Sequence, residues 1–164
     1  MALNAEQIRL LGTLQRNKNV YYQLALSFMG NEAEALDAIS QMTLLIVEKI
    51  HTLRSAEAFL PWSKKILVNV CKEFWRKNPR TLPIDEALAA EGESGLHLEE
   101  ELMLRQEIMK LSENHREVIY LRYYLDYEYK EIARILEVPE GTVKSRLNRA
   151  VEILRTQMGG EEDE

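Results

Sequence analysis

Apolar residues recur every three or four positions along most of this chain, with polar residues between them. That spacing places the apolar residues on one face of an α-helix, so it predicts amphipathic helices rather than strands. Cap, stop and proline signals predict four helices in residues 1–78. Asn4 paired with Gln7 marks the start of the first helix, and Gly30 marks the end of the second. The third is expected to run from a cap at Asn31 to about Ile50, and the fourth from Pro61 to about Lys77.

The same periodicity predicts which residues of two of these helices face the core. The helix after Asn31 is expected to point Ala35, Ile39, Met42, Ile46 and Ile50 inward. The helix after Pro61 is expected to use the stripe Trp62, Ile66, Asn69, Val70 and Phe74. Trp62 is therefore assigned to the core, whereas Trp75 lies off the stripe and is expected at the surface.

Residues 79–98 interrupt the helical pattern with two prolines, two glycines and no strong periodicity, which is typical of a flexible linker. The fold class predicted is all-α, because the chain is rich in helix-forming residues and poor in glycine and proline. We expect two small helical domains, residues 1–78 and 99–158, joined by this linker and followed by an acidic tail at residues 159–164. In the second domain, Ser112 is the predicted N-cap of an internal helix.

Residues 128–155 predict two short helices joined by a tight turn. Apolar stripes at helical spacing mark the two helices, and Pro139 with Gly141 marks the turn between them. The stripes are Ile132, Ala133, Leu136 and Val138 in the first helix, and Val143, Leu147, Ala150, Val151 and Leu154 in the second. This arrangement is typical of a helix-turn-helix, which places its second helix in the major groove of DNA.

The outer face of that second helix is polar and basic. Its candidate DNA-binding residues are Thr142, Lys144, Ser145, Arg146 and Arg149. Arginine can pair with guanine through two hydrogen bonds, so Arg146 and Arg149 are the expected base readers, and Lys144 is expected on phosphate. An ordinary amphipathic helix with a solvated basic face would show the same spacing.

Composition restricts the possible functions. The chain is 46% hydrophobic and 29% charged, as expected of a folded soluble protein, and shows no signal-peptide or membrane-length apolar run. We therefore expect a cytoplasmic protein without membrane insertion. The three histidines are scattered and no glycine-rich phosphate loop is present, so no enzyme activity, cofactor or metal is expected. The single cysteine, Cys71, is expected to be a buried structural thiol.

The net charge of −6 argues against indiscriminate nucleic-acid binding, but the charge is unevenly distributed. Residues 85–101 and 161–164 together hold eleven acidic and no basic residues, and without them the chain would carry +5. Residues 60–80 hold six basic residues against one acid. This distribution is compatible with two DNA contacts made by two separate domains.

The motifs REVIYLR at 116–122, YKEIARIL at 129–136 and GTVKSRLNRA at 141–150 resemble region 4 of bacterial RNA polymerase sigma factors, in particular the extracytoplasmic-function (ECF) group. In the first domain, Phe59, Trp62, Ile66, Asn69 and Arg76 match a motif of sigma region 2. Residues 21–50 resemble the preceding part of that region. The two resemblances follow the family's order and cover roughly residues 19–156.

The resemblance implies a protein that binds RNA polymerase core and directs it to promoters. Region 4 would bind the −35 element as duplex DNA through the second helix of the helix-turn-helix. Region 2 would open the −10 element, with residues 52–58 capturing a flipped base, since single strands are held by positive charge and aromatic stacking. The candidates for −10 binding and melting are Trp62, Lys64, Lys65, Asn69, Lys72, Arg76 and Lys77.

The resemblance also implies two protein partners, RNA polymerase core and an anti-sigma factor. The expected core-polymerase interface consists of Asp37, Gln41, Leu44 and Glu48, which face outward relative to Met42 and Ile46. Two alternatives remain open on the sequence. One is a helix-turn-helix regulator with a sigma-like domain that does not act as a sigma subunit, and the other is a helical adaptor that binds only protein.

Overall fold

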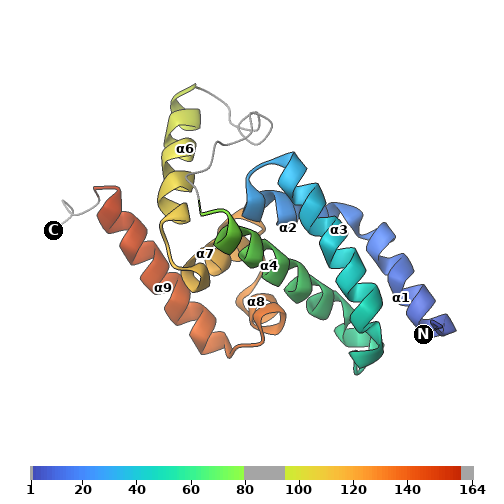
Figure 1. Cartoon of the computed structure of the whole chain (residues 1–164). Helices are drawn as coiled ribbons and strands as arrows, with labels where there is room; N and C mark the ends of the chain where they lie inside the picture. The colour runs from blue at the N-terminus through green and yellow to red at the C-terminus, as the bar shows by residue number, and fades with distance from the viewer. Residues whose placement is uncertain (1, 80–94, 160–164) are drawn as a thin grey trace. The chain divides into compact units, whose positions relative to one another are not determined.

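A computed structural model describes residues 2–79 and 95–159 (Figure 1). Within these residues every regular element is a helix and none is a strand, which confirms the predicted all-α class. Most of the predicted linker, residues 80–94, and the acidic tail from residue 160 lie outside the described residues. The chain divides into two compact units, Met1–Lys77 and Asn78–Glu164.

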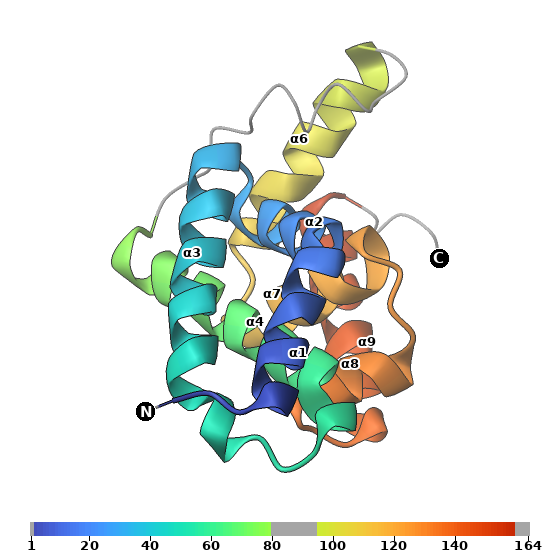
Figure 2. The same cartoon turned by 90° about the vertical axis from the view of Figure 1, so that its right-hand side faces the viewer.

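The first unit is built around three helices that pack on one another: α2 (Lys18–Met29), α3 (Glu32–Lys49) and α4 (Phe59–Lys77). Helix α1 (Ala5–Arg16) lies against α2, as Figure 2 shows, and has no fully buried residue of its own. Two short 3-10 turns, η1 (Ile50–Thr52) and η2 (Ala56–Ala58), connect α3 to α4. The largest fully buried side chains of this unit are Tyr21, Phe28, Phe59, Leu24, Met42, Ile46 and Leu67.

Local signals set the helix ends of this unit. The Asn4 carboxamide oxygen accepts from the Gln7 backbone N–H at 2.8 Å, and the Gln7 side chain accepts from the Asn4 N–H at 3.0 Å, which confirms the predicted capping pair. Gly30 ends α2 with φ 82°, a left-handed conformation that favours glycine. Asn31 then caps α3 by accepting from the Glu34 N–H at 2.9 Å.

The buried face of α4 differs from the predicted stripe. Its buried residues are Phe59, Ser63, Leu67, Val68, Val70, Cys71 and Trp75. Of the predicted set only Val70 is buried; Trp62, Ile66 and Phe74 are half-buried and Asn69 is exposed. The prediction was wrong because α4 carries apolar residues on two sides, and the side that packs on α2 was not the one chosen.

Trp75 shows the consequence most clearly, since it was expected at the surface. It is only 8% exposed, its ring stacks on Phe28 at 5.5 Å, and its indole N–H donates to the Phe28 carbonyl at 3.0 Å. Buried Ser63 lies 2.6 Å from the Tyr21 hydroxyl, which satisfies both polar groups. Cys71 is fully buried as predicted, and burial raises the pKa of its thiol well above the ordinary range.

The predicted inward face of α3 is nearly correct. Ala35, Met42, Ile46 and Ile50 are buried, but Ile39 is only half-buried and Ala38 takes the core position. Ile39 instead lines an apolar groove bordered by α1, α2 and α3. Ala38, which is fully buried, was missing from the predicted inward set.

The second unit contains α6 (Gly95–Met109), α7 (Glu113–Ile119), a π-helical turn η3 (Tyr120–Tyr124), α8 (Tyr129–Leu136) and α9 (Glu140–Gln157). Helix α6 begins inside the segment predicted as linker. Ser112 is the N-cap of α7 by backbone geometry but forms no side-chain cap bond in the structure. Helix α9 packs on both α7 and α8 (Figure 1), with Val143, Leu147, Ala150 and Leu154 buried along one face.

Helices α8 and α9 form the predicted helix-turn-helix, but the residue with the left-handed backbone conformation in the turn is Glu137 and not Gly141. Glu137 ends α8 in the left-handed region at φ 56°, whereas Gly141 already lies within α9. A Cβ added at Gly141 would meet nothing within 4 Å, so the turn does not require glycine there. In α8, Ile132 and Leu136 are buried as predicted, Ala133 is half-buried, and Ile135 is a buried residue that the prediction missed. Val138, which follows the end of α8, is half-buried.

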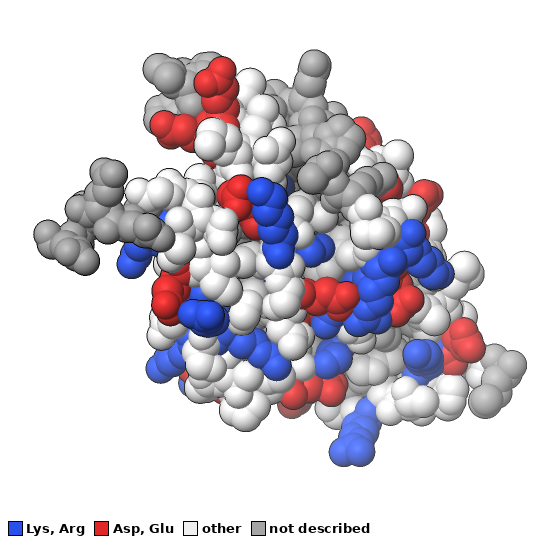
Figure 3. Space-filling view, turned by 60° about the vertical axis from the view of Figure 1, so that its left-hand side comes forward, with Lys and Arg blue, Asp and Glu red and all other residues white. Residues whose placement is uncertain are grey.

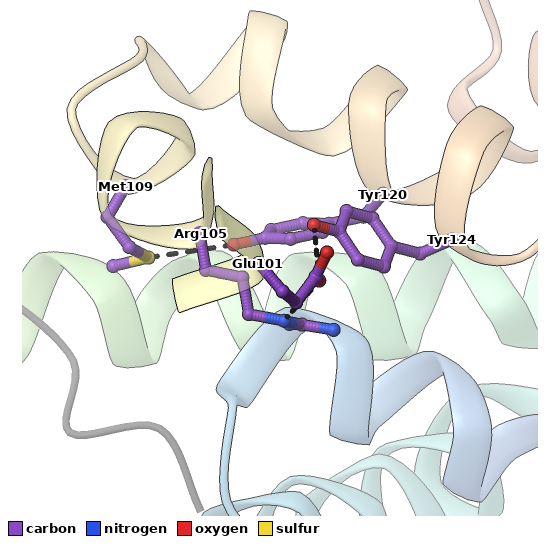
Figure 4. A network of polar contacts seen from close by, with 5 residues as sticks. All are labelled: Glu101, Arg105, Met109, Tyr120 and Tyr124. Atoms are coloured by element: carbon purple, nitrogen blue, oxygen red, sulfur yellow. Dashed lines mark hydrogen bonds and ion pairs between the residues drawn. The ribbon is translucent and has the colours of Figure 1, made fainter. Parts of the chain in front are cut away.

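A polar network joins α6 to η3 (Figure 4). Glu101 accepts from the Arg105 Nε at 3.1 Å and from the Tyr124 hydroxyl at 3.0 Å. The Arg105 guanidinium also lies 4.4 Å from the centre of the Tyr124 ring, a cation–π distance. Tyr120 donates to the Met109 sulfur at 3.6 Å. Because these contacts join α6 to η3, which follows α7 in the chain, they hold α6 on the rest of the second unit.

Candidate nucleic-acid interface

The outward face of α9 carries the residues predicted to bind DNA. Lys144, Ser145 and Arg149 are exposed, whereas Thr142 and Arg146 are half-buried. The helical period places these residues on the outer face, because the buried residues Val143, Leu147 and Ala150 occupy the opposite side of α9. Asn148 is also exposed on this outer side and was left out of the predicted set, although an amide is a good adenine ligand.

These side chains have different surroundings. Arg146 lies 3.8 Å from the carboxylate of Glu117 on α7, and Arg149 lies 3.3 Å from Glu152 one turn along α9. The Ser145 hydroxyl donates to the Thr142 carbonyl at 3.0 Å, and the Lys144 ammonium lies 5.8 Å from the centre of the Tyr129 ring. The predicted residues therefore share a face of one helix, but Arg146 is directed to a neighbouring helix.

The basic face of α9 affects the pKa of His115 on α7. Its pKa is lowered from the ordinary 6.5, first by burial and then by the positive charges of Arg149 and Arg146. The ring is therefore neutral at pH 7. The arginines belong to α9 and His115 to α7, so part of the shift comes from a neighbouring helix.

A pH dependence of stability follows. Because the folded pKa of His115 lies below 6.5, the unfolded chain binds more protons in this range, and the free energy of unfolding falls as the pH drops below 6.5. We expect His115→Asn to reduce this acid loss modestly, since the ring is only partly buried. Urea unfolding of the wild type and the variant, above and below pH 6.5, measures the change in the free energy of unfolding. An unchanged pH dependence in the variant would show that His115 is not its source.

The second basic group lies on α4. Lys64, Lys65 and Lys72 are half-buried, and Asn69, Arg76 and Lys77 are exposed. Arg76 pairs with Glu73 at 2.6 Å. Trp62 is half-buried, with its ring centre 6.0 Å from that of Phe59. The tryptophan accessible beside these charges is thus Trp62, and the structure reverses the predicted exposure of Trp62 and Trp75.

Positive and negative side chains are mixed on the face drawn in Figure 3. In the view of Figure 3, lysine and arginine side chains are interspersed with acidic ones instead of forming one unbroken positive field. Such a surface gives little general attraction for polyanions. Binding to DNA would then depend on particular helices and not on overall charge.

Helix α3 presents the four residues expected to contact polymerase. Asp37, Gln41, Leu44 and Glu48 follow one another at helical spacing and are all exposed. Leu44 is 72% exposed, the most exposed large apolar side chain among the described residues. Burial of so exposed an apolar side chain against a partner would be favourable, because it removes apolar surface from water.

No helix in the described residues is long and apolar enough to cross a membrane. Among the same residues, no group of three or more histidine, cysteine, aspartate or glutamate side chains could hold a metal ion.

Comparison with known proteins defines the class. Residues 13–81 match the family "Sigma-70 region 2", and residues 101–154 match "Sigma-70, region 4". The chain is 28% identical over 149 residues to the RNA polymerase sigma factor SigV of Bacillus subtilis, with 89% of each protein covered. It is 31% identical over 134 residues to the ECF RNA polymerase sigma-E factor of Salmonella typhimurium, covering 72% of this chain and 70% of that protein.

The chain is thus a sigma factor, a DNA-binding transcription initiation factor. More particularly, it belongs to the ECF group of the sigma-70 family. Two solved structures share its fold. One is CnrH in complex with the cytosolic domain of CnrY, with a TM-score of 0.66, 18% identity, and 96% and 97% of the two chains covered. The other is the sigma factor RpoE in complex with the anti-sigma factor NepR from Bartonella quintana, with a TM-score of 0.61, 20% identity, and 93% and 99% covered.

Proposed function

We propose that this sigma factor binds RNA polymerase core through α3, opens the −10 element with α4 and binds the −35 element with α9, with no catalytic chemistry of its own. The observation that carries this proposal is the exposed polar and basic face of α9 in the part that matches sigma region 4. The non-sigma regulator is not favoured, because region 2 and region 4 both match in the family's order.

At the −35 element, α9 would lie in the major groove. Lys144 and Arg149 supply positive charge for phosphate or guanine, and Ser145 adds a short hydrogen-bonding group. All three are exposed on the outer side of the helix. The small basic surface is consistent with a protein that relies on polymerase for much of its hold on DNA.

At the −10 element, the exposed side of α4 would hold the separated strand. Trp62 offers a ring face for stacking, and the lysines at 64, 65 and 72 neutralise phosphates nearby. Residues 52–58, which run through the end of η1 to η2, would hold a flipped base as their resemblance to the family's loop implies. Trp75 takes no part in this surface, since it is buried against Phe28.

We expect Trp62→Ala to weaken binding of holoenzyme to a single-stranded oligonucleotide of the −10 sequence by about five- to 150-fold, since stacking on an aromatic side chain contributes roughly 1–3 kcal/mol per base. Fluorescence anisotropy measures the affinity. Leu60→Ala is the matched control, because Leu60 is a partly exposed apolar residue, 38% exposed, of the same helix. An equal loss of −35 duplex binding in the Trp62 variant would count against a specific role in the −10 strand.

We also propose that the protein acts in the cytoplasm and is held inactive by a protein partner of the anti-sigma type. This proposal is supported by the RpoE structure, which is a complex with the anti-sigma factor NepR. Purification of the tagged full chain from cells, followed by mass spectrometry, tests it. The cells are grown without an inducing stress. If polymerase subunits are recovered without any other stoichiometric protein, the proposed inhibition by an anti-sigma partner is contradicted.

The central experiment is run-off transcription with purified core polymerase and the full chain on a library of genomic promoters. We expect transcripts that start downstream of a shared two-part motif. The matched control replaces Lys144 and Arg149 by glutamine, which removes the charge from α9 while keeping side chains of similar length. Transcription no higher than that of core alone would overturn the proposed function.

A further inference from the structure

Glu117 is an unusual residue for the interior of a small helical unit. It lies on α7 and is only 2% exposed. Its carboxylate oxygen Oε1 stands 3.8 Å from Nη1 of Arg146 on α9. A carboxylate with so little access to water requires hydrogen bonds or a cation beside it, because burial of an uncompensated charge is strongly unfavourable.

Arg146 differs from the other basic residues of α9 in its placement. Its side chain is 25% exposed, compared with 60% for that of Arg149. Moving its guanidinium outward to a base edge or a phosphate would take a cation away from the buried carboxylate.

We propose that Arg146 is a positioning residue that anchors the recognition helix to α7 through Glu117, and that direct reading of DNA falls to Lys144, Ser145, Asn148 and Arg149. This inference rests on the proposed role of α9 at the −35 element. The anchor spans the two helices that pack most closely around the core of this unit, so it fixes the rotation of α9 about its own axis. That rotation decides which side chains point into the groove.

Asn148 enters the reading set for a geometric reason. It lies three residues after Ser145 and four after Lys144, so it occupies the same exposed side of α9. Its amide can pair with adenine through two hydrogen bonds, and it carries no charge. Asn148 would therefore add sequence preference without adding salt dependence.

The stability test is a double-mutant cycle in the full chain, with Glu117→Gln, Arg146→Gln and the double variant. Arg146→Gln is expected to lower the urea midpoint, because it removes the Arg146 guanidinium that lies 3.8 Å from the buried carboxylate. The double variant should recover much of that loss, since two glutamines can hydrogen-bond without charge. Additive effects of the two substitutions would overturn the anchor.

The DNA test uses the same variants assembled with core polymerase, probed with a randomised duplex library and with one fluorescent duplex at several salt concentrations. The double variant should keep the wild-type motif and salt slope. Lys144→Gln or Arg149→Gln should reduce the slope by about one, and Asn148→Ala should relax the motif at constant slope. If the double variant recovers its stability but loses about one unit of salt slope, Arg146 is a DNA ligand and the inference is wrong.

Failure of the proposed −35 function can be distinguished from failure of the inference about Arg146 and the DNA-reading residues. If wild-type holoenzyme selects no motif, the proposed −35 function fails and the reading set fails with it, while the double-mutant cycle still decides the Glu117–Arg146 anchor. If the wild type selects a motif that Asn148→Ala leaves unchanged, the reading set proposed here is wrong and the −35 function stands.

Discussion

Replacement of Trp75 by alanine is expected to lower the free energy of unfolding by about 3–5 kcal/mol, the usual cost of removing a buried large aromatic side chain. The indole ring is 8% exposed, stacks on Phe28 at 5.5 Å and donates to the Phe28 carbonyl at 3.0 Å. Small domains are stable by only about 5–15 kcal/mol, so the loss is a large fraction of the total. Urea unfolding of the full chain, followed by circular dichroism, measures the change.

Trp62→Ala is the matched control for this experiment. It removes the same side chain from the same helix, but at a half-buried position without a hydrogen bond between the indole and the backbone of another helix in the structure. We expect its cost to be well under half that of Trp75→Ala. Equal losses for the two variants would show that the burial of Trp75 does not hold in solution.

Replacement of Leu44 by aspartate is expected to weaken binding to RNA polymerase core at least about 30-fold, corresponding to roughly 2 kcal/mol, the threshold for an interface hot spot. Leu44 is 72% exposed on α3 and lies between Gln41 and Glu48 on the proposed polymerase-binding face. A new carboxylate there would be desolvated without a partner. Titration of labelled full chain with purified core measures the dissociation constant.

Because Leu44 is exposed, the same substitution should leave the urea midpoint nearly unchanged. Ile8→Asp is the matched control, since Ile8 on α1 is 59% exposed but lies outside the proposed face. Charge reversal at Asp37 and Glu48 together should also weaken core binding. Normal affinity in the Leu44 variant, with Ile8→Asp affecting binding instead, would move the polymerase surface to α1.

The helix-turn-helix shows how far local sequence information reaches. The apolar period of residues 140–157 predicted the buried side of α9: Val143, Leu147, Ala150 and Leu154 are buried as expected, and Val151 is half-buried. That pattern depends only on neighbours three and four positions apart, so it can be recognised without knowledge of the fold. It could not reveal that Arg146 turns toward Glu117, because this contact requires α7 to be packed on α9.

Local sequence information did not predict the buried face of helix α4. Its sequence carries apolar residues on two sides, and periodicity alone cannot choose between them. The choice is made by α2, which brings Phe28 against Trp75, a residue 47 positions away in the chain. For the same reason the accessible tryptophan of the proposed −10 surface is Trp62.

The sequence by itself therefore determined the all-α class, the helix caps at Asn4 and Asn31, and the ECF sigma-factor family, since these depend on short-range spacing and motifs. Only the tertiary structure decided which face of α4 is buried and which arginine of α9 is held by a buried carboxylate. Both depend on burial, and burial is created by helices that are distant in sequence and adjacent in space.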